Sequence, residues 1–210
     1  VVEKLSDEKL ISYFKDDEDS WVRKAVVNKL SDEKLIYDTF KDDVAWEVRF
    51  AVVEKLSDEN LIFNTFNDDE DCDVRKAVIK KLSDEKFIFD TFKDDEYWKV
   101  RRAVVEKLSD EKLIYSFKDD EDCEVREAVV EKLSDEQLIF NTFKDDKYWK
   151  VREAVIEKLS DEKLIFDTFK DDEDCDVREA VVERLSDEKL IYSFKDDEGL
   201  DIRRAVIKKL

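Results

Sequence analysis

The chain has 210 residues, of which 42% are hydrophobic and 47% charged, and its formal net charge is −20. A surface with this much negative charge repels phosphate backbones, which argues against nucleic-acid binding and favours a basic protein or peptide as partner. No apolar run approaches the roughly 20 residues that cross a bilayer, and no signal-peptide pattern opens the chain, so we expect a cytoplasmic protein that does not bind membranes.

One sequence unit recurs along the whole chain. Equivalent valines lie 25 or 26 residues apart, at Val1, Val26, Val52, Val78, Val104, Val129, Val155 and Val181, with a partial unit from Val206. A fixed period in this range indicates a solenoid. Because the chain has no proline and a single glycine, Gly199, we find no interdomain linker and predict one continuous array over residues 1–210.

Each unit predicts two short helices, of which the first begins at the motif SDE. We expect its serine to be the N-cap, with the acidic residues behind it favoured by the helix dipole. These serines are Ser6, Ser31, Ser57, Ser83, Ser109, Ser134, Ser160 and Ser186. In the unit that begins at Ser31, the apolar residues Leu35, Ile36, Tyr37 and Phe40 are expected to form the buried face.

The second helix carries an apolar stripe with helical spacing. In one unit the stripe consists of Val48, Ala51, Val52, Val53 and Leu56. A helix pair this short is marginal by itself in water, so each pair is expected to share a core with its neighbours.

The pattern DDxxxxVRxAVxxKL resembles HEAT-like repeats, including the short phycobilisome-lyase type, and the leucine-rich repeat variant. The resemblance implies an all-α fold: a right-handed α-solenoid (superhelix) of about eight two-helix repeats. Leucine-rich variants usually carry prolines, which this chain does not, so both helices of a pair are expected to be mostly α.

In HEAT repeats an aspartate six residues before an arginine forms part of a ladder of bonds between neighbouring units. The spacing recurs here in every unit. The central pairs are Asp43/Arg49, Asp69/Arg75, Asp95/Arg101 and Asp120/Arg126, and the outer pairs are Asp17/Arg23, Asp146/Arg152, Asp172/Arg178 and Asp197/Arg203. The planar guanidinium suits a residue that bridges two acceptors.

The cysteines and acidic loops do not predict a metal site or a cofactor. Cys72, Cys123 and Cys175 occupy one repeat position, two units apart, which is too far for a disulfide, and neither histidine nor a CxxC motif accompanies them. The acidic loop at residues 68–73 lacks the turn glycine and distant glutamate of a calcium loop. We interpret the cysteines as structural filling and the acidic residues as solvated loop and helix caps.

Catalysis has little support in this sequence. Without any histidine, the chain has no His-based triad and no His-ligated metal, so we predict that it is not an enzyme. Chemistry by carboxylates alone stays open, although no carboxylate pair stands out from the periodic background.

Large and small residues alternate at one repeat position. The row reads Ser20, Trp46, Cys72, Trp98, Cys123, Trp149, Cys175 and Leu200. Packing between neighbours explains such alternation. The alternative is a row of exposed tryptophans that grips a partner.

The second helices predict the binding surface. In HEAT-like relatives these helices line the concave side, and on them the positions of Glu47, Phe50 and Glu54 share one face. Over three later units these positions hold eight carboxylates: Glu124, Glu127, Glu131, Glu153, Glu157, Asp176, Glu179 and Glu183. Possible aromatic contacts are Trp21, Phe50, Tyr97 and Tyr148.

We therefore predict a noncatalytic protein-interaction scaffold whose acidic concave face binds a basic protein or peptide. The alternative is that this face is an ordinary solvated surface, because the whole chain is acidic. Two further hypotheses are an acidic DNA-mimic-type inhibitor of a basic protein and an architectural array that stacks head to tail. Stacking would use apolar edges that we expect to be exposed, namely Val1, Val2 and Leu5 at one end and Ile202, Val206 and Leu210 at the other.

Overall fold

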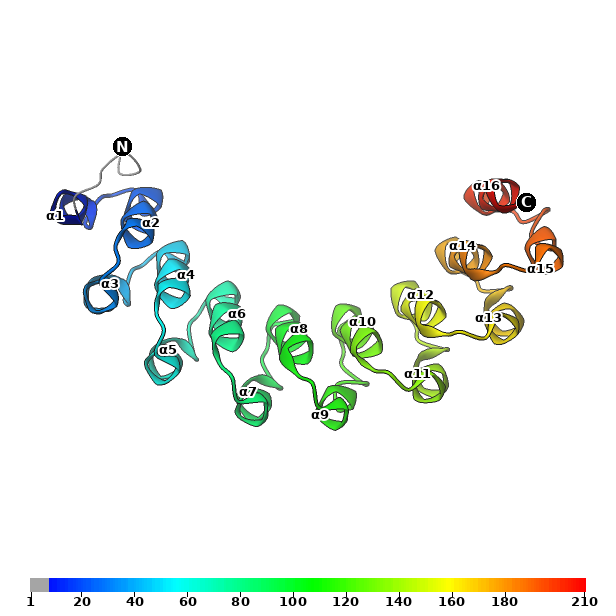
Figure 1. Ribbon diagram of the computed structural model, residues 1–210, viewed down its shortest axis with the longest axis horizontal. Helices are drawn as coiled ribbons and strands as arrows, with labels where there is room; N and C mark the ends of the chain where they lie inside the picture. The colour runs from blue at the N-terminus through cyan, green and yellow to red at the C-terminus, as the bar shows by residue number, and fades with distance from the viewer. Residues whose placement is uncertain (1–7) are drawn as a thin grey trace. The chain divides into compact units, whose positions relative to one another are not determined.

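The computed structural model describes residues 8–210, so the predictions for Val1, Val2, Leu5 and Ser6 lie outside the described residues. Over that range the secondary structure is helical, without strands, and successive helices form pairs (Figure 1). This confirms the predicted all-α solenoid of repeats. Within the same range no helix is both long and apolar enough to cross a membrane.

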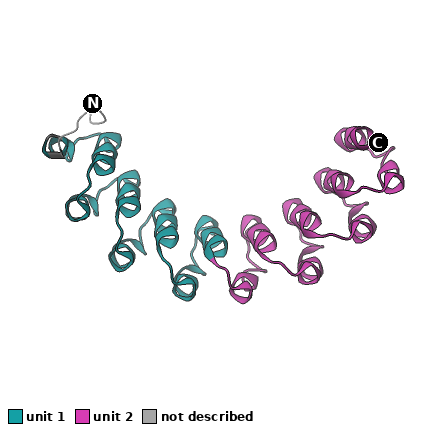
Figure 2. Cartoon of the chain, viewed as in Figure 1, with its two compact units in different colours: residues 1–107 teal, residues 108–210 magenta. Residues whose placement is uncertain are grey.

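The contacts divide the chain into two compact units, residues 1–107 and residues 108–210 (Figure 2). In unit 1 the first helices of the pairs are α1 (Glu8–Ile11) with the short 3-10 helix η2 (Ser12–Phe14), α3 (Glu33–Phe40), α5 (Glu59–Phe66) and α7 (Glu85–Phe92). Its second helices are α2 (Ser20–Lys29), α4 (Trp46–Lys55), α6 (Cys72–Lys81) and α8 (Trp98–Lys107).

Unit 2 repeats this arrangement. Its first helices are α9 (Glu111–Tyr115), α11 (Glu136–Phe143), α13 (Glu162–Phe169) and α15 (Glu188–Tyr192), and its second helices are α10 (Cys123–Lys132), α12 (Trp149–Lys158), α14 (Cys175–Arg184) and α16 (Leu200–Lys209). α9 and α15 have 5 residues where α11 and α13 have 8, because their repeats are one residue shorter.

Within each unit the second helices form one continuous layer. α2, α4, α6 and α8 pack in sequence, as do α10, α12, α14 and α16, and from α3 onward each first helix packs against the second helix of its own pair. The core lies between these layers, where Val48, Val52 and Val53 of α4 and Ile62 of α5 are each 0% exposed. Burying each such side chain contributes about 1.5–3 kcal/mol, which explains why the short helices form only as an array.

The predicted stripe of the second helix is confirmed, since Ala51 and Leu56 are buried together with these valines. The expectation for the first helix was partly wrong. Ile36 and Phe40 are buried, but Leu35 is 41% exposed, because an eight-residue helix brings only one narrow face against α4. Leu35 lies beside that face.

From α3 onward, the first helices are capped by aspartate and not by serine, so the N-cap prediction was wrong for these helices. In α13 the carboxylate of Asp161 accepts hydrogen bonds from the backbone N–H groups of Lys163, at 2.9 Å, and Leu164, at 3.0 Å. The preceding Ser160 instead donates from both its N–H and its hydroxyl to Glu136 of the previous repeat, at 2.9 Å. Serine therefore links repeats, and the aspartate that follows it begins the helix.

Candidate binding face

An arginine–aspartate ladder connects neighbouring repeats inside each unit. Arg126 on α10 donates from Nε and Nη2 to both carboxylate oxygens of Asp146, at 2.7 and 2.8 Å, and from Nη1 to the backbone oxygen of Asp120, at 2.6 Å. The two side chains are only 5% and 9% exposed. The side-chain partner therefore lies 20 residues ahead, in the next repeat, while the aspartate six residues behind contributes its backbone carbonyl.

The same two-way contact recurs in both units. In unit 1, Arg23, Arg49 and Arg75 bind Asp43, Asp69 and Asp95, and in unit 2, Arg152 and Arg178 bind Asp172 and Asp197. Arg101 is also buried, and its Nη1 donates to the backbone oxygen of Asp95 at 2.7 Å. These contacts are structural: they join neighbouring repeats and hold the second helices in register.

Tyr97 and Tyr148, which are 45% and 44% exposed, lie beside this ladder. The guanidinium carbon of Arg75 lies 5.2 Å from the ring centroid of Tyr97, and that of Arg126 lies 5.4 Å from the ring of Tyr148. Each ring covers an arginine that is already bound to an aspartate, a cation–π contact that shields the ion pair from water.

The eight predicted carboxylates, which we call the acidic face, lie on α10, α12 and α14 within unit 2. Glu131, Glu157 and Glu183 near the helix C-termini are exposed, as is Asp176, whereas Glu127, Glu153 and Glu179 in the middle of the helices are half-buried. This difference follows from position, because the middle residues lie beside the neighbouring second helix and the outer ones point into solvent.

The half-buried carboxylates repel one another. Burial, followed by the charges of Glu157, Asp176 and Glu127, raises the pKa of Glu153 above its ordinary value. Burial and the charges of Glu183, Asp201 and Asp176 likewise raise the pKa of Glu179. The folded chain therefore holds negative charges together at a cost that a cationic partner would relieve.

One lysine neutralises part of the acidic face at its N-terminal edge. Lys150 on α12 lies 3.0 Å from Glu124 on α10, and the hydrogen bond to Glu124 raises the pKa of Lys150. Glu124 is thus paired with a cation, whereas Glu153 and Glu179 each have several carboxylates around them.

The equivalent positions of unit 1 have a mixed character. Lys24, Phe50, Lys76 and Arg102 stand where unit 2 has Glu127, Glu153, Glu179 and Arg204. Of the predicted aromatic contacts, Trp21 and Phe50 do lie on this face. Lys24 Nζ lies 5.1 Å from the ring centroid of Trp21 and 5.9 Å from that of Phe50, so this lysine joins two neighbouring helices.

The alternating row at the start of the second helices is only partly packed. Trp98 and Trp149 are half-buried, as are Cys72 and Cys123, whereas Trp46 is 37% exposed and stacks edge-on against Phe50, with ring centroids 6.4 Å apart. All three cysteines are free thiols. The row thus combines packing with partial exposure and is not a continuous row of exposed tryptophans.

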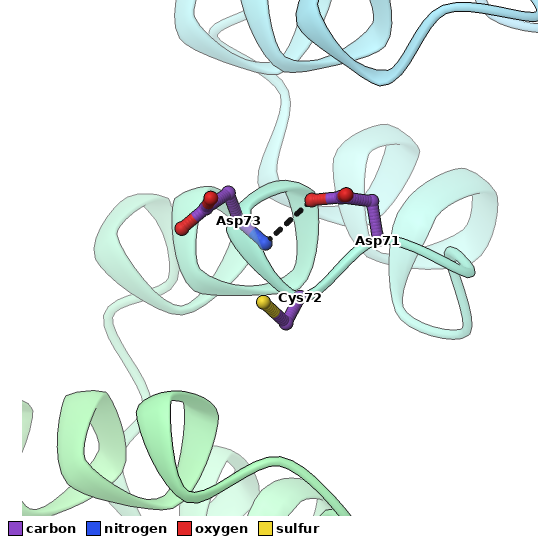
Figure 3. Close-up of side chains that lie close together, drawn as sticks. All are labelled: Asp71, Cys72 and Asp73. Atoms are coloured by element: carbon purple, nitrogen blue, oxygen red, sulfur yellow. Dashed lines mark hydrogen bonds between the residues drawn. The ribbon is translucent and has the colours of Figure 1, made fainter.

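Within residues 8–210, two groups of acidic and thiol side chains lie close enough together to consider a metal: Asp71, Cys72 and Asp73, and the equivalent Asp174, Cys175 and Asp176. Figure 3 shows the first group, in which the carboxylate of Asp71 accepts a hydrogen bond from the N–H of Asp73 at 2.8 Å as the N-cap of α6. Asp73 also forms an ion pair with Lys76 at 2.9 Å. These contacts account for both carboxylates through helix capping and charge pairing.

The C-terminal apolar edge differs from the predicted one. Ile202 and Val206 are 1% and 3% exposed, because α16 packs against α14 and α15, so the expectation of their exposure was wrong. Leu210 is 56% exposed as expected. Among the large apolar side chains of α16, Ile207 is the most exposed, at 78%, although its equivalents in the other repeats, including Val182 and Ile156, are fully buried.

Comparisons with known proteins identify the fold. No protein-family model matches the chain, and no curated protein matches its sequence. Among solved structures, a leucine-rich repeat variant described as having a novel repetitive structural motif is similar, with a TM-score of 0.72 and 25% sequence identity. The match covers 97% of this chain and 82% of that one. The chain is therefore an α-solenoid of HEAT-like helix pairs that is similar in structure to a leucine-rich repeat variant, which confirms the resemblance seen in its repeats.

Proposed function

We propose that the protein is a noncatalytic interaction scaffold whose acidic face binds a basic protein or peptide segment. The observation that carries the proposal is the group of mutually repelling, half-buried carboxylates on neighbouring helices, centred on Glu153 and Glu179. A bound lysine or arginine side chain would relieve this repulsion, whereas a carboxylate on a loop would be screened by solvent and gain little.

The repeat spacing suggests the form of the ligand. Packed second helices lie about 8–10 Å apart. An extended peptide in the polyproline II conformation rises about 3.1 Å per residue with three residues per turn, so every third side chain lies on the same side. Cationic side chains at every third position of an extended segment would therefore each meet one helix of unit 2, with one cation near each of Glu127, Glu153 and Glu179.

The test uses a fluorescein-labelled peptide with lysine at every third position in a Gly/Ser background. Fluorescence anisotropy should show binding that weakens steeply with salt. A triple charge reversal, Glu127→Lys, Glu153→Lys and Glu179→Lys, should abolish that binding. The matched control reverses three exposed carboxylates of unit 2 outside the acidic face, Asp167, Glu173 and Glu188. Equal loss in both variants, or binding that survives the first triple reversal, would rule out the acidic face as the site.

The same assay addresses the DNA-mimic hypothesis. A scaffold for basic segments and a mimic of nucleic acid would both bind cations, but a mimic should compete with duplex DNA for one basic protein. We propose a cytoplasmic location for this scaffold, which suits its three free thiols.

Head-to-tail stacking is a second candidate, favoured by the exposure of Ile207. Its equivalents are covered by the next repeat, and a second copy could cover Ile207 in the same manner. Light scattering should then report a mass that rises with concentration, and the Ile207→Lys variant should remain monomeric. A wild-type chain that stays monomeric at high concentration would exclude stacking.

A further inference from the structure

Three surface positions on each second helix are charged almost throughout the chain. They are the positions of Glu47, Phe50 and Glu54 on α4 and their equivalents on α2, α6, α8, α10, α12, α14 and α16. Of these 24 positions, 21 hold Asp, Glu, Lys or Arg. The three uncharged residues, Trp21, Asn28 and Phe50, all lie on the neighbouring helices α2 and α4. Chance exceptions to the pattern would be scattered along the array.

The three exceptions surround one lysine. Lys24 lies one turn before Asn28 and one turn after Trp21 on α2, and its Nζ reaches the rings of both Trp21 and Phe50. Trp21 is 65% exposed, far more than a core tryptophan, and Phe50 packs edge-on against the partly exposed ring of Trp46. The result is an exposed aromatic surface with a single ammonium group at its centre.

Lys24 differs from the other cations at its repeat position in its ion pairing. The other cations of that row have carboxylate neighbours: Lys76 pairs with Asp73, Arg102 with Glu106, and Arg204 with Asp201. Within residues 8–210, Lys24 has no ion-pair partner, although the chain has 59 acidic residues. Its position over two rings leaves the ammonium group available to an incoming carboxylate.

We infer that Trp21, Lys24, Asn28 and Phe50 form a docking site, here called the aromatic site, for a peptide segment that carries a large apolar side chain next to a carboxylate. The apolar side chain would pack against the two rings, the carboxylate would pair with Lys24, and the Asn28 amide would donate to the peptide backbone. A cationic ligand is disfavoured because the ammonium group of Lys24, which lies near both rings, would repel it. The surface is open and formed by two helices, which suits a peptide better than an enclosed small molecule.

The aromatic site differs from the acidic face in both place and chemistry. It lies on α2 and α4 of unit 1, and its preferred partner is acidic, whereas the acidic face lies in unit 2 and attracts cations. The two sites therefore have opposite salt-bridge chemistry and can be tested separately.

The probe is a labelled peptide with one phenylalanine flanked by two glutamates in a Gly/Ser background, followed by fluorescence anisotropy. We expect saturable binding that is lost when the phenylalanine of the peptide becomes alanine. The variants Trp21→Lys and Phe50→Lys should each lower the affinity by about tenfold or more. Both add positive charge, so electrostatics alone would raise the affinity for this peptide. Lysine already occupies these positions in other repeats, at Lys99 and Lys76, so both variants are compatible with the helix.

The charge of Lys24 is tested by inversion. Lys24→Glu should weaken binding of the glutamate-flanked peptide and strengthen binding of the same peptide with lysines in place of the glutamates. The control variant Tyr192→Lys, at an exposed tyrosine of unit 2, should leave the affinity within twofold, about the scatter of a neutral contact. The inference is overturned if the phenylalanine peptide binds no better than the alanine peptide, or if Trp21→Lys and Phe50→Lys leave its affinity unchanged.

Discussion

Replacing Arg126 with alanine should destabilise unit 2 more than any change on its exposed surfaces. The substitution removes two hydrogen bonds to Asp146 and one each to the backbone oxygens of Asp120 and Glu121. The carboxylate of Asp146 would then remain about nine-tenths buried without its guanidinium partner.

The expected cost follows from that remaining charge. Breaking a buried ion pair from one side typically costs about 3–5 kcal/mol. Asp146 would keep its hydrogen bond from the N–H of Tyr148, at 2.9 Å, so we expect the lower end, about 3 kcal/mol. Arg203 provides the comparison, because within residues 8–210 its guanidinium donates only to backbone oxygens, those of Asp197, Glu198 and Gly199. Arg203→Ala should therefore cost about 1 kcal/mol, and Arg101→Ala, at a buried ladder position, should resemble Arg126→Ala.

Urea unfolding followed by far-ultraviolet circular dichroism measures these differences from the shift of the transition. The double variant Arg126→Ala with Asp146→Ala should be more stable than the sum of the single effects, because it removes the buried charge along with its partner. The coupling should be roughly 1–3 kcal/mol. Equal, small shifts for Arg126→Ala, Arg101→Ala and Arg203→Ala, together with additive single effects, would refute a structural ladder.

Three further predictions concern a helix cap, a carboxyl group whose pKa is raised and one whose pKa is lowered. In urea unfolding, Asp161→Ala should destabilise the protein by about 1 kcal/mol, because the N-cap of α13 is lost. Ser160→Ala should destabilise it less. A larger effect of Ser160→Ala would indicate that serine is the N-cap after all. Burial and the neighbouring carboxylates raise the pKa of Glu153, so this side chain binds its proton more tightly in the folded chain than in the unfolded chain. The ionised Glu153 therefore destabilises the fold at neutral pH. This destabilisation fades as the pH falls toward 4.5, the ordinary pKa of glutamate. Glu153→Gln should therefore raise the melting temperature at neutral pH and lose this effect in acid, whereas the exposed Glu131→Gln should change it less at every pH. For Asp197, burial alone would raise the pKa, but the hydrogen bonds from Arg178 and Gly199 outweigh burial and lower the pKa. The ionised Asp197 should therefore stabilise the folded chain above pH 3.8, and this stabilisation should be lost only in stronger acid. Asp197→Asn should consequently destabilise the protein at neutral pH, and the stability of this variant should fall less steeply as the pH is lowered into acid.

The resemblance and the repeat together predicted the helix pairs, and local physics explains why that part was reliable. The valine stripe of α4 follows helical periodicity, and burial of Val48 and Val52 needs only a neighbouring copy of the same unit. The acidic face could also be read from the sequence, because its members recur at one repeat spacing on helices whose orientation the stripe defines.

What the sequence could not determine is which of two adjacent polar residues meets which partner. In Ser160–Asp161 either side chain can cap a helix, and only the position of Glu136 in the previous repeat draws the serine away. The six-residue spacing of Asp120 and Arg126 predicted bonds between neighbouring units. Which aspartate meets the Arg126 guanidinium is decided by stacking, which brings Asp146, 20 residues onward, beside it. Tyr148 is 44% exposed, as expected of a surface contact, but only tertiary packing shows that its ring also lies over Arg126. Periodicity therefore determined the helices and their buried faces, since these depend on neighbours along the chain, whereas tertiary structure decided the polar partners, since these depend on distances across the stack.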